Sequence, residues 1–97
     1  MKLTQTQIKF LKAQAHHRKP VVTIGNAGLT PAVLREVEIA LKAHELIKLK
    51  LPALERAERQ GLFETACTET GAQAVQHIGR IAVLYRRADK PKIQLPS

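Results

Sequence analysis

Residues 19–30 read KPVVTIGNAGLT, and Pro31 follows them. Four β-branched residues precede the first glycine, which favours a short buried strand because such side chains fit a pleated surface. After the glycines, Thr30 is a good N-cap, and the next position suits a proline because its missing N–H has no partner to lose there. The stretch therefore predicts a strand over residues 21–24, a tight loop over Gly25-Asn26-Ala27-Gly28 and a helix to about residue 44.

Helical and extended patterns alternate outward from this junction. Upstream, Thr4 and Gln7 have the spacing of a capping box, and apolar positions at helical period predict a helix over about residues 5–15. Downstream, residues 46–51 alternate apolar side chains with lysines, as in a strand with one solvated face. After Pro52, the pattern predicts a third helical stretch through Leu54 to a left-handed cap at Gly71, and Gly61 within it leaves open a start only near Arg56. Strands are predicted over 74–78 and 81–85, joined by the two-residue turn Gly79-Arg80.

The order of these elements, α-β-α-β-α-β-β, predicts an α/β fold in one domain over residues 1–97. Strand–helix–strand units favour parallel neighbours, and the terminal hairpin adds an antiparallel pair. We therefore expect a four-stranded mixed sheet packed with helices in one layer or two. The tail from about residue 88 to 97 contains two prolines, and it either adds an edge strand or lies loose.

Composition excludes several classes of protein. Apolar residues make up 44% of the chain, too many for a disordered polycation. No apolar run approaches the roughly 18 to 20 residues of a membrane span, and the N-terminus lacks the apolar centre of a secretory signal. The single cysteine, Cys67, cannot form an internal disulfide. We expect a cytoplasmic protein with no membrane partner.

The formal net charge of +8 is concentrated at the two ends of the chain. The first 35 residues contain no acid, and their bases are Lys2, Lys9, Lys12, Arg18, Lys19 and Arg35. From residue 70 onward, Asp89 is the one acid. If the fold brings the two ends together, they form a positive surface that attracts a polyanion and releases its counterions. The alternative is that the charge only keeps the protein soluble.

The Gly25–Gly28 loop has the chemistry of an anion site. The first turn of a helix leaves backbone N–H groups without internal partners, and glycines let a phosphate approach the main chain. A P-loop requires a lysine where Leu29 stands, and a dinucleotide fingerprint requires a third glycine and an acid after the next strand. A phosphate of a polymer backbone is therefore the better ligand. The alternative is that the two glycines only serve a turn.

Four strings together resemble the YhbY family, the stand-alone bacterial form of the CRM domain, an RNA-binding module named for chloroplast RNA splicing and ribosome maturation. They are residues 19–30, HELIKLK at 44–50, ETGA at 69–72 and IGRIAVLYR at 78–86. The resemblance covers nearly the whole chain, although a glycine at position 61 of the third helix is unexpected. It implies a fold similar to the C-terminal domain of translation initiation factor three, a GxxG loop that binds RNA, and association with precursors of the large ribosomal subunit.

By position, the resemblance assigns RNA binding to Gly25, Asn26, Ala27 and Gly28, with the basic neighbours Arg18, Lys19, Lys48 and Arg86. Lys48 and Lys50 are either RNA contacts on an open sheet face or only the solvated side of an amphipathic strand. Lys9 and Lys12 would extend the positive face if the first helix packs beside the loop, and are otherwise ordinary surface.

The sequence offers no constellation for catalysis or metal binding. His16 and His17 are adjacent and point apart, no other ligand joins them at a suitable spacing, and no carboxylate pair or nucleophile–histidine arrangement stands out. We therefore expect no metal, no cofactor and no enzymatic activity. The loop and the charge predict an RNA-binding protein, and the resemblance implies that its partner is ribosomal RNA. Two alternatives stay open: a regulator that binds a nucleotide or phosphorylated metabolite, and a ribosome-associated protein–protein adaptor.

Overall fold

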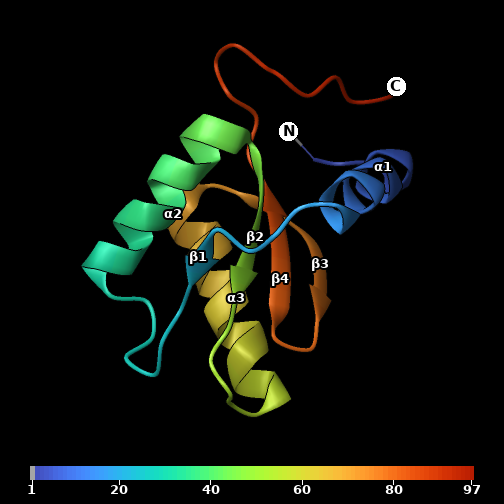
Figure 1. Ribbon diagram of the computed structural model, residues 1–97. Helices are drawn as coiled ribbons and strands as arrows, with labels where there is room; N and C mark the ends of the chain where they lie inside the picture. The colour runs from blue at the N-terminus through green and yellow to red at the C-terminus, as the bar shows by residue number, and fades with distance from the viewer. Residues whose placement is uncertain (1) are drawn as a thin grey trace.

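The computed structural model describes residues 2–97 and has the predicted order of elements (Figure 1). The elements are α1 (Gln5–His16), β1 (Val22–Thr23), α2 (Pro31–His44), β2 (Leu46–Lys50), α3 (Arg56–Thr70), β3 (Gln73–Ile78) and β4 (Ile81–Tyr85). The α/β class and the four-stranded mixed sheet are confirmed. The first strand, β1, is shorter than the predicted 21–24, although the N–H groups of Val21 and Ile24 also donate to carbonyls of β2.

The strands are ordered β1-β2-β4-β3 across the sheet. β1 and β2 are parallel neighbours joined through α2, whereas β4 is antiparallel to both β2 and β3. β4 therefore lies between β2 and β3, so these two strands are parallel but do not pair. The expectation of parallel neighbours holds for the first strand–helix–strand unit and fails for the second, because the hairpin returns β4 to the place beside β2.

Helices cover both faces of the sheet, so the helices form two layers. One hydrophobic core lies between the sheet and the pair α2 and α3, and a second lies between the sheet and α1. The side chains of β4 alternate between the two, since Ala82 and Leu84 belong to the first core and Val83 and Tyr85 to the second. This alternation is the period of two that a strand imposes.

The helix α1 covers only part of its side of the sheet, where it packs on β2 and β3 (Figure 1). On that side of β2, Leu46 is buried, Lys48 is half-buried and Lys50 is exposed. The strand predicted to have one solvated face is therefore covered by α1 at its beginning and solvated toward its end. We call the uncovered part the open face of the sheet.

The predicted signals at helix ends and at the hairpin are confirmed. The Gln7 N–H donates to Thr4 Oγ1 over 3.1 Å and the Thr4 N–H to Gln7 Oε1 over 3.0 Å, which completes the capping box. Gly71 ends α3 in the left-handed conformation. Gly79 has φ 56°, so glycine suits the first position of the β3–β4 turn because a side chain there would be strained.

The tail after Arg86 crosses the end of the sheet without pairing. Among the described residues, none after Tyr85 lies in a strand. Pro91 and Pro96 lack the N–H groups that a ladder requires. Instead, the side chains of Ile93 and Leu95 pack against the core beneath α1.

Glu45 anchors this tail. Its carboxylate accepts the backbone N–H groups of Ala88, Lys92 and Ile93 over 2.9, 2.6 and 2.9 Å. The residue is 1% exposed and has φ 63° and ψ −46°, a strained conformation for a non-glycine residue. A buried acid thus connects the end of α2 to a segment more than forty residues later in the chain.

Cys67 packs on the core beneath α2 and α3, and burial, with the nearby Glu64 carboxylate, raises the pKa of its thiol to about 11 from 9.0. At pH 8 this leaves on the order of a hundredfold less thiolate than an ordinary cysteine has. We expect alkylation of the native protein by iodoacetamide to be slower than in denaturant by about that factor, as measured by mass spectrometry over time. Equal rates in the two states would contradict the assignment.

Candidate functional site

The Gly25–Gly28 loop is bare and lies at the end of β1. Gly25, Asn26 and Ala27 are exposed, and a Cβ built on Gly25 would meet nothing within 4 Å. The Gly28 N–H closes the turn on the Gly25 carbonyl over 3.0 Å, and Gly28 itself has φ 77°. The loop is therefore open at Gly25, where an anion can approach the main chain, whereas a Cβ on Gly28 would lie 3.8 Å from the side chain of Leu62.

The backbone N–H groups that are free to bind an anion lie mostly in the loop, and fewer lie in the first turn of α2. Pro31 has no N–H, the Thr30 hydroxyl accepts the Val33 N–H over 3.2 Å, and the Leu34 N–H bonds the Thr30 carbonyl. The start of α2 therefore offers fewer free donors than the argument from helix ends assumes. Within residues 2–97, the hydrogen bonds leave unused the amides of Asn26, Ala27, Leu29 and Ala32.

Cationic side chains follow β2 from one end to the other. At its beginning, the Arg18 guanidinium donates to the Leu46 carbonyl over 2.8 Å; beyond its end, Arg80 Nε donates to the Leu51 carbonyl over 2.9 Å. Between them, the two lysines of β2 occupy alternate positions, about 7 Å apart, on the open face. We call this set the β2 basic row, and its members are Arg18, Lys48, Lys50 and Arg80.

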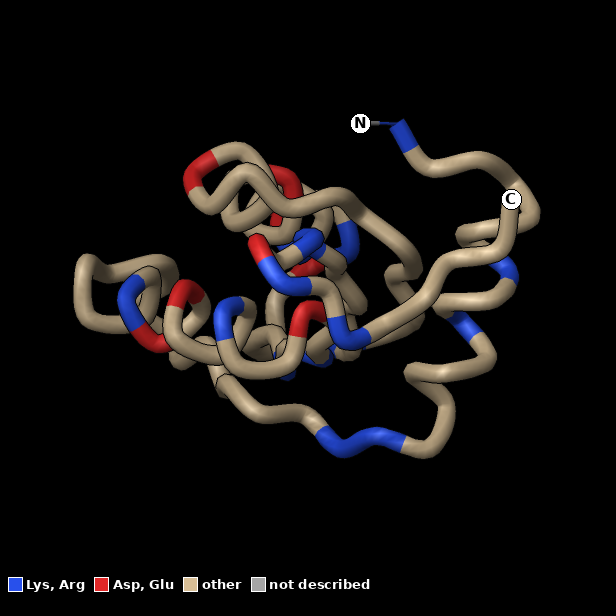
Figure 2. Tube along the Cα trace, turned by 90° about the horizontal axis from the view of Figure 1, so that it is seen from above, with Lys and Arg blue, Asp and Glu red and all other residues tan. Residues whose placement is uncertain are grey.

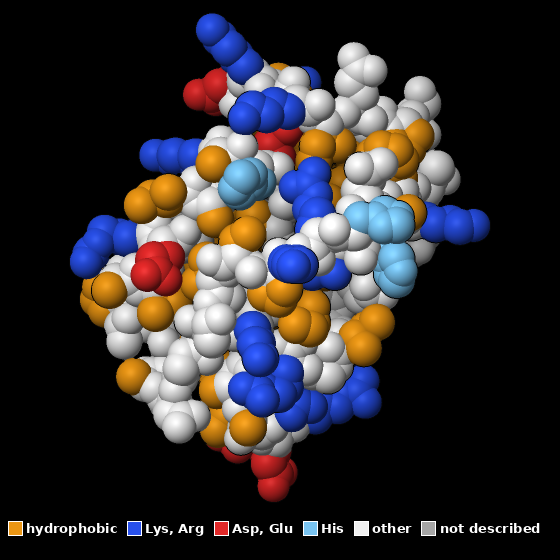
Figure 3. Space-filling model, in the orientation of Figure 1, with side chains coloured by type: hydrophobic (Ala, Val, Ile, Leu, Met, Phe, Trp, Pro, Cys, Tyr) orange, Lys and Arg blue, Asp and Glu red, His pale blue; other side chains and the backbone are white. Residues whose placement is uncertain are grey.

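The loop begins at the lower end of this row. The Ile24 N–H donates to the Lys50 carbonyl over 2.8 Å, so Gly25 lies one residue from the pairing with β2. At the other end, the Val21 N–H bonds the Lys48 carbonyl, which places the exposed Lys19 close by. The fold thus brings Arg18 and Lys19 close to β2 and Lys48, while the loop lies at the end of β1, where it leads into α2 and a Cβ on Gly28 would lie 3.8 Å from the Leu62 side chain of α3. In Figure 3, Lys and Arg side chains follow one another down the middle of this face.

Acidic side chains lie on the other side of the sheet. Apart from Asp89, every acid belongs to α2, to α3 or to a residue that caps one of them. In Figure 2, α1 and the connector to β1 carry blue segments and no red one. Because α2 and α3 pack on the opposite face, acidic side chains reach only the edges of this view (Figure 3), and the ion pair recorded among the described residues, Arg86–Glu38, does not involve the β2 basic row.

Two predicted cations on α1 do not join the loop. Lys9 and Lys12 are exposed on α1, which packs over the far part of the sheet while the loop lies at the opposite end of β1 (Figure 1). They enlarge the positive surface without contacting the loop or the β2 basic row.

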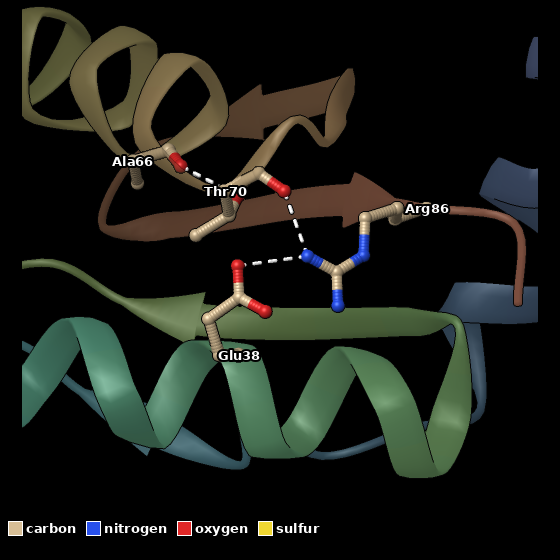
Figure 4. Close-up of polar contacts among 4 residues, drawn as sticks. All are labelled: Glu38, Ala66, Thr70 and Arg86. Atoms are coloured by element: carbon tan, nitrogen blue, oxygen red, sulfur yellow. Dashed lines mark hydrogen bonds and ion pairs between the residues drawn. The ribbon is translucent and has the colours of Figure 1, made fainter.

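Arg86 lies between α2 and α3 instead of on the open face (Figure 4). Its guanidinium donates to Glu38 Oε1 over 2.8 Å and to the Thr70 carbonyl over 2.7 Å. The hydrogen bond from Arg86 outweighs burial and lowers the pKa of Glu38 below its ordinary value. In this structure, Arg86 connects two helices at the end of the sheet far from the loop.

Arg80 is the member of the row that the sequence did not single out, whereas Lys50 was considered together with Lys48 without being assigned to the site. The alternation of residues 46–51 in the sequence already places Lys50 on the same side of the strand as Lys48. Nothing local marks Arg80, because its place beside Leu51 depends on the pairing of β4 with β2.

The described part of the chain contains neither a cluster of metal ligands nor a helix that could span a membrane. Residues 2–97 contain no group of three or more His, Cys, Asp or Glu side chains arranged to hold a metal ion. Over the same range, no helix is both long enough and apolar enough to cross a bilayer.

A bare glycine loop beside an acid-free row of cations defines a small α/β domain suited to binding an anionic polymer. The chain belongs to the CRS1 / YhbY (CRM) domain family, whose model matches residues 3–86, and the resemblance seen in the sequence is confirmed. It is 49% identical to an RNA-binding protein of Haemophilus influenzae over 97% of this chain and 95% of the relative. It is 45% identical to a candidate RNA-binding protein of Pseudomonas aeruginosa over 98% of this chain and 91% of the relative.

The fold is also found in a solved structure. The solution structure of a candidate RNA-binding protein of Staphylococcus aureus superposes with a TM-score of 0.86 at 30% sequence identity. The match covers 98% of this chain and 100% of the other.

Proposed function

We propose that this chain binds RNA in the cytoplasm through the Gly25–Gly28 loop and the β2 basic row. The observation that carries the proposal is the position of the exposed loop amides, one residue beyond the strand pairing that presents Lys50. Family membership and the names of the relatives favour RNA as the polymer. The protein acts as a binding module and not as an enzyme.

The geometry suits recognition of the backbone. Loop amides donate hydrogen bonds to the oxygens of a phosphate, as backbone donors at helix starts do in other proteins. Side chains of the β2 basic row then neutralise the phosphates that follow along the strand of RNA, with release of counterions. The loop amides and the β2 basic row both recognise the charge and shape of the RNA backbone, so we expect the affinity for RNA to depend strongly on salt.

The RNA we propose is ribosomal RNA in precursors of the large subunit, as the resemblance to the YhbY family implies. Crosslinking the chain to RNA in cells, followed by sequencing of the attached fragments, tests this proposal. We expect fragments of large-subunit RNA to be enriched, and the chain to sediment with large-subunit precursors until nuclease releases it. Sedimentation that survives nuclease treatment would instead identify a protein–protein adaptor.

Changing Asn26 and Ala27 together to aspartate tests the loop. The two carboxylates would lie where we place the phosphate, so we expect affinity for a structured hairpin RNA to fall about tenfold or more at moderate salt. Fluorescence anisotropy measures the affinity, and thermal unfolding checks the fold.

The matched control is the pair Thr65→Asp and Thr68→Asp, which adds the same charge at exposed positions on α3. Its affinity should fall much less. Equal losses in the two double variants would show that only net charge matters, and would remove the loop from the site.

A further inference from the structure

A hollow of about 390 Å³ lies at the upper end of the β2 basic row. Its walls are the connector over residues 18–21, His44 at the end of α2, and Leu46 with Ile47 at the start of β2. The volume falls in the range typical of small-ligand sites, about 300 to 1,000 Å³. The hollow is at the opposite end of the row from the Gly25–Gly28 loop.

The lining combines an apolar floor with a polar rim. Leu46 and Ile47 close the bottom of the hollow but are each 1% exposed and face opposite sides of the sheet, so the apolar surface open to a ligand is mainly that of Val21, which is 50% exposed at the mouth. Arg18 and Lys19 supply cations and His44 a planar ring. In Figure 3, apolar and histidine side chains lie among the Lys and Arg side chains in the upper middle of this face.

The Arg18 side chain is held in place at this hollow. Its hydrogen bond to the Leu46 carbonyl uses one nitrogen of the guanidinium and fixes the group beside the floor. Among the described residues, no carboxylate lies within ion-pair distance of it. A planar guanidinium held this way offers a surface on which a nucleobase can stack, as arginine does in the recognition of unpaired RNA bases.

From these contacts we propose that the hollow receives one unstacked nucleotide of the bound RNA, with its base over Val21 and its phosphate toward Lys19. This inference rests on the proposed function, because the β2 basic row leads the RNA backbone to the hollow. The base would stack against Arg18 or His44. A purely electrostatic surface would need no apolar floor at this position.

Crosslinking within the hollow tests the proposal directly. The probe is a pool of short single-stranded RNA of random sequence that contains 4-thiouridine, irradiated with the full chain and analysed by mass spectrometry. We expect attached peptides to include residues 18–21 or 44–47. If the chain binds the pool and the loop variant weakens that binding, but no attached peptide comes from these residues, the hollow is not a base site and the proposed function stands. If the chain binds neither the single-stranded pool nor the hairpin RNA, both the proposed function and the base site fail.

A pair of uncharged substitutions tests independently whether a base binds in the hollow. Val21→Met places a flexible apolar side chain at the mouth of the hollow, whereas Ile39→Met makes a comparable change at a 67% exposed position on α2. We expect Val21→Met to weaken binding of the pool about tenfold, the effect of losing one stacked base, without changing the dependence on salt. Ile39→Met should bind like the unaltered chain. Equal affinities of the two variants would overturn the assignment.

Free nucleoside monophosphates distinguish an RNA site from a metabolite site. We expect them to bind only weakly, because the loop and the row would then contribute nothing. Saturable micromolar binding of a mononucleotide in the hollow, with no preference for RNA, would overturn the proposal in favour of a nucleotide-binding regulator.

Discussion

Changing Lys48 and Lys50 together to glutamate should weaken binding of a hairpin RNA by about two orders of magnitude at moderate salt, on the order of a factor of ten for each reversed charge. Both lysines lie on the open face, at alternate positions of β2, with the Gly25–Gly28 loop directly beyond Lys50. Because neither lysine forms an ion pair with a carboxylate among the described residues, the reversal introduces repulsion toward the RNA without breaking an ion pair. The slope of log affinity against log salt should also become shallower, since fewer counterions are released.

The matched control is the double variant Lys9→Glu and Lys12→Glu. It changes the net charge of the chain by the same amount, at exposed positions on α1 away from the loop. We expect a loss of affinity several times smaller. Fluorescence anisotropy across a salt series measures both variants, and circular dichroism confirms that each remains folded. If the α1 pair costs as much as the β2 pair, the RNA does not follow β2.

Changing Glu45 to alanine should lower the free energy of unfolding by about 2–4 kcal/mol, because three backbone N–H groups would lose a charged acceptor. The carboxylate is the common partner of Ala88, Lys92 and Ile93, and its loss should release the tail from the end of α2. Urea unfolding measures the stability, and hydrogen exchange at the three amides reports the release. Glu36→Ala, at an exposed position of α2, is the control and should change little.

Glycine at position 45 separates the carboxylate from the backbone. Glu45→Gly loses the same hydrogen bonds, but glycine adopts φ 63° without strain, so it should be less destabilising than alanine by about 1 kcal/mol. If glycine and alanine destabilise equally, the positive φ carries no strain.

The contribution of Glu45 depends on pH in a defined direction. Burial acts to raise the pKa of its carboxyl, but the N–H groups of Ala88, Ile93 and Lys92 together with the Lys92 charge lower it more, so the net pKa lies below the ordinary 4.5. An acid with a lowered pKa stabilises the fold above its ordinary pKa, and this stabilisation disappears as the pH falls through the lowered value. The difference in stability between the unaltered chain and Glu45→Ala should therefore be full at neutral pH and shrink below about pH 4.5. A difference that stays constant to pH 3 would contradict this account.

Much of the fold could be predicted because its signals are local. The Thr4–Gln7 capping box, the Thr30-Pro31 helix start and the glycine at the first position of the β3–β4 turn each depend on residues within a few positions of one another. Such signals act through backbone conformation and neighbouring hydrogen bonds, which the order of residues specifies directly. The same holds for the bare loop, since glycine and small side chains leave it open whatever surrounds it.

The membership of the basic surface was harder to predict. Arg18, Lys48 and Arg86 are alike in sequence as cations beside apolar segments. Arg18 and Lys48 lie along the open face, whereas Arg86 bonds Glu38 and Thr70 on the side of α2 and α3. Which side a cation takes depends on the register of β4 between β2 and β3, and nothing near Arg86 in the chain specifies that register.

The order of residues alone determined the elements, their sequence along the chain, the exposed glycine loop and the excess of positive charge at the two ends. These follow from conformational preferences and composition, which act over short distances. Tertiary structure decided that α1 covers only part of its face of the sheet, that Arg80 joins the β2 basic row while Arg86 does not, and that a buried glutamate holds the tail. Those outcomes depend on contacts between residues tens of positions apart, whose free energy exists only once the sheet has formed.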